Sequence, residues 1–324
     1  MTLTKNAKYF LLIAILVICV ILSLLSGRYP ARGFINLFEL SNDPIGSNVF
    51  YNLRVPRVIL GVLLGMTLGA SGLIFQTVFN NPLVDSGMLG VMQGAAFGAA
   101  LGIVFFESRA GIVQSFAIGF GLCGLILSVL SARRIRYGGW TLRLILAGSV
   151  VSAFFSAMLA MLKVLADGRN QLHAIEFWLM GGLGYTTWRG LPIVIVIVVC
   201  CLIVMWLLRW RVNLMSLNIE TGTSLGVRVI LERLVVLSVT VFAVAAVTSL
   251  SGIVGWVGLI VPHMARRLFS ADTRDALPAA MLIGAILILI CDNGSRTLTP
   301  IEIPLGVLTA FFGVIIFIAL MRKR

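Results

Sequence analysis

The sequence is poor in acidic residues and in histidine. Among its 324 residues, 12 are Asp or Glu and 2 are His, against 25 Lys or Arg. His173 and His263 lie in separate parts of the chain, so the converging His/Asp/Glu set of a membrane-embedded enzyme is lacking. The 5 cysteines have no CxxC spacing, and the phosphate-binding pattern GxxxxGKS/T is absent. We therefore expect no catalytic site, no metal site and no cofactor in this chain.

Hydrophobic residues, by contrast, make up 60% of the chain, and the mean hydropathy is +1.07. Because about 20 apolar residues cross a bilayer, this composition excludes an ordinary soluble domain. The run 234–261 is too long for one crossing and is interrupted by Gly252, Gly255 and Gly258, so we divide it in two. We predict one all-α, polytopic membrane domain over residues 1–324, with ten spans at 10–27, 58–79, 87–106, 110–132, 144–162, 191–208, 231–251, 257–269, 276–298 and 303–321.

The basic residues are distributed unevenly between the two ends of these spans. With both termini in the cytoplasm, the inner side carries 16 basic and 5 acidic residues, and the outer side carries 9 and 7. Since positive charge collects on cytoplasmic loops, this orientation in the inner (cytoplasmic) membrane is favoured over its inverse. Topology and contact with membrane lipid thus account for most of the basic excess, and we expect no nucleic-acid partner.

Glycine is abundant inside the spans, at spacings of three to four residues. Such spacing places small side chains along one helix face and lets neighbouring helices approach closely. Close packing is therefore the favoured role over a lining role in a pore. The two sets are Gly61, Gly65, Gly69 and Gly72 in one span, and Gly90, Gly94, Gly98 and Gly102 in the next.

Two further segments are neither spans nor simple loops. Residues 170–190 are apolar but short and end in glycines, which is typical of a re-entrant or interfacial helix. Residues 212–230 form the longest inner loop and contain a short amphipathic pattern. This loop could lie on the lipid surface or bind another protein.

Three stretches carry a resemblance to a known family. They are QTVFNNPL at 76–83, GIVGWVGLIVPHMAR at 252–266, and DNGSR at 292–296 followed by PLG at 304–306. In this order they resemble the FecCD-type permeases, membrane subunits of binding-protein-dependent ABC importers for ferric siderophores, haem and cobalamin. The motif residues, taken as structural, are Gln76, Asn81, Pro82, Leu83, Gly258, Pro262, His263, Asp292, Pro304 and Gly306.

The resemblance implies a BtuC-like permease fold with ten spans, and a homodimer or a pseudo-symmetric pair of permeases. It also implies two copies of a cytoplasmic ATPase subunit, which bind ATP and Mg, and a periplasmic or lipid-anchored substrate-binding protein. Ferric siderophore is the expected cargo, with haem and cobalamin as alternatives. An ion-coupled secondary transporter is the alternative from another class, but it would place acidic residues near the bilayer midplane. Here the nearest candidates, Asp292 and Glu302, lie at span ends.

The resemblance also assigns roles to two inner segments. The loop at 212–230 is expected to dock into a groove of the ATPase and so to couple ATP hydrolysis to transport. An inner gate is expected in the turn before the fifth span, at Thr141 and Leu142. The coupling residues would be Leu217, Glu220, Gly222, Leu225 and Gly226, with small residues for close approach and leucines for an apolar groove.

Three arginines fall on the outer side, where positive charge is expected to be scarce. Arg54 and Arg57 flank Pro56, and Arg296 ends the ninth span. Guanidinium groups pair carboxylates bidentately, and the resemblance places these three at the rim that receives the binding protein, so we expect them to dock it. The alternatives are interfacial snorkelling for Arg54 and Arg57, and an i,i+4 pair with Asp292 for Arg296.

Two polar residues within or beside the spans are expected to be structural. His263 shares its helix face with no second metal ligand, which favours a structural hydrogen bond over a metal or proton-relay role. Asp85 follows Asn81-Pro82 and is expected to cap the next helix.

Overall fold

The computed structural model describes residues 4–29, 33–34, 43–106, 109–216, 219–224, 226 and 228–322. Each of the ten predicted spans corresponds to one helix, so the predicted all-α polytopic fold is confirmed. The helices are α1 (Lys5–Leu25), α3 (Val55–Val78), α4 (Val91–Phe105), α5 (Ala110–Arg134), α6 (Trp140–Leu165), α8 (Leu191–Leu207), α11 (Val229–Ser251), α12 (Val257–Leu268), α13 (Thr273–Thr297) and α14 (Leu305–Arg322).

Shorter elements connect these helices. A two-residue antiparallel pairing joins β1 (Ser26–Gly27) to β2 (Gly33–Phe34) after α1. The others are α2 (Pro44–Val49), the π-helical turn η1 (Phe50–Arg54), the 3₁₀ turn η2 (Ser86–Leu89), α7 (Gln171–Met180), α9 (Arg209–Met215) and α10 (Ile219–Ser224). The 10-residue α7 fits the short helix predicted within 170–190.

Within the described residues, six helices are long and apolar enough to cross a membrane, and α8 with α9 makes a seventh if the pair is one span. That pair bends by 61°. The apolar helices α4 and α14 are shorter, and α12 has only 12 residues. The break between α11 and α12 lies at 252–256, where the glycine spacing predicted it.

Helix α3 is the buried centre of the bundle, and its glycines set its distance to two neighbours. A Cβ at Gly65 would lie 2.3 Å from the carbonyl oxygen of Gly284 in α13, and one at Gly72 would lie 1.8 Å from that of Gly258 in α12. In α4, Gly98 meets the backbone of α5 in the same way. The backbones are therefore in direct contact, and the predicted packing role of these glycines is confirmed.

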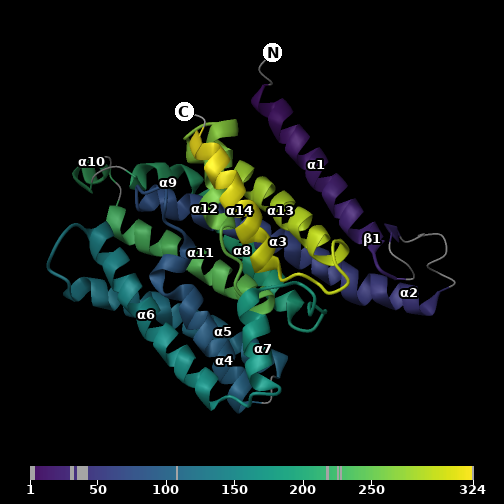
Figure 1. The fold of residues 1–324 in the computed structure, drawn as a ribbon. Helices are drawn as coiled ribbons and strands as arrows, with labels where there is room; N and C mark the ends of the chain where they lie inside the picture. Colours follow the sequence, from purple (N-terminus) through teal and green to yellow (C-terminus); the bar gives the residue numbers. More distant parts are fainter. Residues whose placement is uncertain are drawn as a thin grey trace.

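The start of α1 and the end of α14 lie on the same side of the bundle, and α1 runs along its outside (Figure 1). Polar contacts fix α1 to α13 at both ends. The Lys5 ammonium lies 2.5 Å from Asp275, and the Asn293 amide donates to Ser23 at 2.8 Å. The side of the bundle where α1 begins and α14 finishes is called the terminal face below, and the other side the distal face.

Candidate functional site

The first two motif stretches meet where α3 packs on α12. Pro262 has no N–H, so it cannot donate the helical hydrogen bond that the carbonyl oxygen of Gly258, four residues earlier, would otherwise accept. The Gln76 amide reaches this region and donates to the carbonyl oxygens of Leu259 at 3.1 Å and Gly258 at 3.5 Å. The Gln76 carbonyl oxygen accepts from Arg266 at 2.6 Å. One amide thereby ties the two helices together around the proline.

His263 makes the structural contact that the sequence favoured. Its Nδ1 lies 2.8 Å from the carbonyl oxygen of Leu259, one turn earlier in α12, so Nδ1 is the donor. No group of three or more His, Cys, Asp or Glu side chains that could hold a metal ion occurs in the described part of the chain. The ring is therefore bonded to its own helix.

The turn after α3 contains the other residues of the first motif. Asn81 accepts from the backbone N–H of Leu83 at 2.9 Å, which folds the chain around Pro82, and Leu83 is exposed. The Asp85 carboxylate accepts from the N–H of Gly87 at 2.9 Å and so caps η2, as predicted. This turn leads the chain back into the bundle as α4.

A buried ionic cluster lies at the distal face, where α3 begins and α13 ends. The Nε of Arg57 donates to Asp292 at 2.9 Å, and its two terminal nitrogens donate to Glu302 at 2.9 and 3.0 Å. Arg296 lies 3.2 Å from the second oxygen of Asp292, one turn away in α13. The i,i+4 pair that the sequence offered as an alternative for Arg296 is thus present.

Arg296 and a further arginine, Arg54, also hold the end of α1. Arg54 donates to the carbonyl oxygens of Leu24, Leu25 and Tyr29 at 3.0 to 3.1 Å. Arg296 donates to those of Ser23 and Ser26 at 2.9 and 3.2 Å. The last carbonyls of a helix lack intrahelical partners and attract cations, so these contacts stabilise the α1 terminus.

The expectation that these three arginines face an external partner is wrong for this conformation. Their exposed fractions are 5% for Arg54, 8% for Arg57 and 5% for Arg296. Each guanidinium is already bonded to carboxylates or carbonyls within the chain, because the helix ends that converge here need cations. All three lie at the distal face, but none of them is accessible there.

Three helix breaks meet beside this cluster. Gly181 and Gly252 adopt positive φ values of 67° and 66°, which suit glycine. Gly182 N–H donates to the carbonyl oxygen of Ser251 at 2.7 Å, and Leu305 N–H donates to that of Gly181 at 2.9 Å. A Cβ at the motif residue Gly306 would lie 2.4 Å from the carbonyl oxygen of Met180. The motif stretch that begins at Pro304 therefore joins α14 to the end of α7 and the start of the α11–α12 break.

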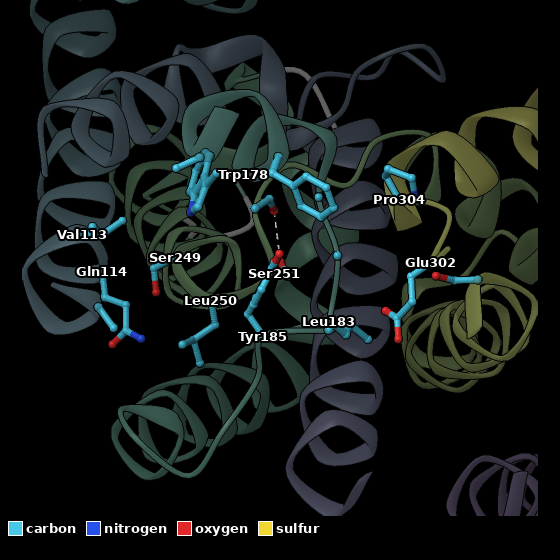
Figure 2. Close-up of a pocket in the computed structure, with 18 of the residues that line it drawn as sticks. Val113, Gln114, Trp178, Leu183, Tyr185, Ser249, Leu250, Ser251, Glu302 and Pro304 are labelled. Atoms are coloured by element: carbon cyan, nitrogen blue, oxygen red, sulfur yellow. Dashed lines mark hydrogen bonds between the residues drawn. The ribbon is translucent and has the colours of Figure 1, made fainter. Parts of the chain in front are cut away.

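A cavity of about 650 Å³ opens next to this junction. Figure 2 shows Gln114 and Trp178 on one side, Tyr185 and Leu183 in the 181–185 segment, and Glu302 on the other side. The walls are mainly apolar. The Trp178 indole N–H is buried and has no hydrogen-bond partner among the described residues. Glu302 links the cavity to Arg57, so a change in the ionic cluster would reach the cavity wall.

At the terminal face, α9 and α10 lie over the segment 212–230, for which a coupling role stays a prediction. Asn213 of α9 is held to α13, where it accepts from Thr273 N–H at 2.9 Å and donates to Asp272 at 2.7 Å. Hydrogen bonds from Arg274 hold the pKa of Asp272 well below its usual range. The predicted coupling residues Leu217 and Leu225, and the side chain of Glu220, lie outside the described residues; Gly226 is exposed, with φ 79°.

Gly222 has a role that differs from the one its size suggested. It is buried, and a Cβ there would lie 2.5 Å from the Val229 side chain at the start of α11. The absence of a side chain at Gly222 therefore lets α10 pack on α11. From the sequence, the same small size was expected to let the ATPase subunit approach closely.

Helix α6 begins at Trp140, so the predicted gate residues Thr141 and Leu142 form its first turn at the terminal face. Leu142 is exposed. Farther along, Val150, Phe154 and Met161 expose an apolar face of the same helix. Thr141 and Leu142 thus stand at one end of a helix face that the described residues leave uncovered.

Sequence reasoning missed three features of these sites. Glu302 was considered only as an acid of a secondary transporter, and its pairing with Arg57 was not foreseen. Gly181 was not singled out, although the glycine pair 181–182 after an apolar helix was a usable signal for a junction. Arg233, which is buried one turn into α11 at the terminal face, was not singled out either. A lone Arg within the predicted span 231–251 was a second usable signal, because charges in spans are rare.

Comparisons with known proteins agree with this architecture. Residues 13–323 match the FecCD transport family. The molybdate import system permease protein MolB of Haemophilus influenzae is 37% identical over 321 residues, covering 97% of this chain and 95% of that protein. The hemin transport system permease protein HmuU of Yersinia pestis is 34% identical over 316 residues, covering 96% and 94%.

A solved structure gives the same result in three dimensions. A metal-chelate type ABC transporter in an inward-facing conformation superposes with a TM-score of 0.89 at 36% identity, covering 97% of this chain and 98% of that one. The chain therefore belongs to the FecCD transport family, as a membrane permease subunit of an ABC importer of metal chelates that has no catalytic site or cofactor of its own.

Proposed function

We propose that this chain forms the translocation path of an importer with its terminal face in the cytoplasm. The observation that carries the proposal is the end-to-end similarity to a metal-chelate type ABC transporter in an inward-facing conformation. The charge distribution supports the orientation, because Arg133, Arg134, Arg209, Arg211 and Arg267 all lie at helix ends of the terminal face. The distal face is then periplasmic.

The path would lie between two copies of this chain. The described residues of one copy leave the apolar faces of α6 and α14 uncovered, with Val150 and Phe154 on one and Phe311 on the other. A second copy packed against them would shield these faces, and Ser149 and Ser156, both exposed on α6, would give the path a weakly polar wall. Thr141 and Leu142 of each copy would then close its cytoplasmic end.

The coupling loop would receive two ATPase subunits, one for each copy. Because α10 sits on α11 through Gly222, its orientation depends on that contact. Gly222→Trp is expected to displace α10 and to abolish both cargo uptake and cargo-stimulated ATP hydrolysis, while membrane insertion stays normal. Uptake and ATPase assays on the assembled importer measure this. Unimpaired coupling in the Trp variant would contradict a docking role for α10.

The binding protein would dock on the periplasmic rim above the cavity. With Arg54, Arg57 and Arg296 enclosed, an accessible cation there is Arg189, flanked by exposed Trp188 and near exposed Tyr185. Arg and aromatic side chains are the types enriched at protein interfaces. We propose that acidic residues of the binding protein meet Arg189 and that the buried arginines support the rim from below.

Arg189→Glu is expected to weaken binding of the purified binding protein by about tenfold or more at low salt, since an attractive charge pair becomes repulsive. The effect should shrink as salt is raised. Arg169→Glu, at another exposed distal site, is the matched control and should change affinity little. Equal affinities of the wild type and the Arg189 variant would move the docking site elsewhere.

The cargo is proposed to be a ferric siderophore, handed over by the binding protein. Haem and cobalamin are the alternatives from the same family, and molybdate is a further one because MolB, with 37% identity, is named for it. Uptake of labelled ferric siderophore, haem, cobalamin and molybdate into proteoliposomes that contain the cognate ATPase and binding protein separates them. Uptake of the siderophore is the expected result, and uptake of another cargo alone would replace it.

A further inference from the structure

Arg233 is a buried cation that the ionic cluster and the cavity do not involve. It lies one turn into α11 at the terminal face and is 7% exposed. A guanidinium placed inside a bundle loses hydration, so its contacts must compensate for that cost. Those contacts reach two elements that are far from each other in the sequence.

The first contact is with the end of α9. Arg233 donates from Nε to the carbonyl oxygen of Met215 at 3.1 Å, and its Nη2 donates to the same oxygen. Met215 is the last residue of α9, so this carbonyl belongs to the set that has no intrahelical partner. Asn213, two residues earlier, is fixed to α13. If α10 and the segment before it are displaced, Met215 is therefore the first residue of the bundle that the displacement reaches.

The second contact is with the start of α6. The guanidinium carbon of Arg233 lies 5.4 Å from the ring centroid of Trp140, a cation–π distance. Trp140 is the first residue of α6, and Thr141 and Leu142 follow directly. The Trp140 ring also stacks on Phe79 at 6.0 Å, and Phe79 stacks on Phe75 of α3 at 5.7 Å. The indole thus contacts both an aromatic stack that continues into α3 and the cation.

We propose that Arg233 is a positioning residue that transmits movement of the coupling loop to the inner gate. The guanidinium is rigid and planar, so a shift of the Met215 carbonyl either carries the cation with it or breaks both hydrogen bonds. In both cases the contact between Arg233 and Trp140 changes. The first turn of α6 then either loses this contact or moves together with the guanidinium. The inference rests on the proposed function, since it needs the coupling loop and the gate to act as stated.

The test uses the full-length chain assembled with its ATPase and binding protein in proteoliposomes. Arg233→Met keeps the apolar bulk and removes the guanidinium. We expect it to retain ATPase binding and ATP hydrolysis while the number of cargo molecules imported per ATP falls by about tenfold. Arg233→Lys keeps the charge and can reach the carbonyl, so it should recover part of the ratio. Arg134→Met, at an exposed site on α5, is the control and should leave the ratio unchanged.

A second variant keeps the test decisive if Arg233→Met does not fold. Trp140→Leu removes the other partner and should lower the same ratio, and the double variant should be no worse than the more affected single one. The inference would be overturned if Arg233→Lys and Trp140→Leu both left the ratio of cargo to ATP unchanged, while Arg233→Met was also unchanged or did not fold. Failure of the proposed function would look different, because the wild type itself would show no ATP-driven uptake.

Discussion

Gly65→Ala is expected to destabilise the chain strongly, although alanine is the better helix former. The added Cβ would lie 2.3 Å from the carbonyl oxygen of Gly284 and 2.5 Å from the Cα of Ala285. Both are backbone atoms, so no side-chain rotation relieves the overlap and α3 must move away from α13. Overpacking of this kind costs about 1–3 kcal/mol, with rigid backbone contacts toward the upper end.

The control for this prediction is the same substitution in another helix. Gly119 lies in α5, and a Cβ there would meet no atom within 4 Å. Gly119→Ala should leave the protein as stable as the wild type or slightly more stable, since a helical Gly is disfavoured by about 0.5–1 kcal/mol relative to Ala. Thermal unfolding of both variants in detergent measures the difference. Equal midpoints would show that the α3–α13 contact is looser than described.

Asp292→Asn should have an effect of comparable size at the distal face. Asp292 is 1% exposed and pairs with both Arg57 and Arg296. Removal of its charge leaves two buried guanidinium groups with Glu302 as the remaining carboxylate of the cluster. Breaking a buried pair from one side costs about 3–5 kcal/mol. We therefore expect a large loss in thermal stability and in the amount of protein found in the membrane.

Glu302→Gln provides the matched comparison. Its side chain is 43% exposed and bonds only Arg57 within the cluster, so water can compensate for part of the lost charge. The midpoint of thermal unfolding should fall much less than for Asp292→Asn. If both variants unfold at the wild-type temperature, the cluster does not hold the ends of α1, α3 and α13 together.

The order and position of the spans could be predicted from the sequence because a bilayer imposes one dominant rule. Apolar length places the helices, and the glycines at 252, 255 and 258 locate the break between α11 and α12. Glycine spacing also gave the packing faces of α3 and α4. Each of these signals is local in the chain, so no knowledge of distant contacts was needed.

The ionic cluster could not be predicted in the same way. Arg57 is separated by 235 residues from Asp292 and by 245 from Glu302. A charge count places all three on the distal side, but it does not distinguish a guanidinium offered to a partner from one already paired inside. Gly222 shows the same limit, because a small residue permits close approach to whichever surface the fold brings near it, here Val229.

The central claim is that this chain imports its cargo with energy from a separate ATPase. The most direct measurement is uptake of labelled ferric siderophore into proteoliposomes that hold the chain and its cognate ATPase, with binding protein and ATP supplied on opposite sides. We predict uptake only when ATP is on the side of the terminal face and the binding protein is on the side of the distal face. Uptake driven by a proton or sodium gradient in the absence of ATP would contradict the account and favour a secondary transporter.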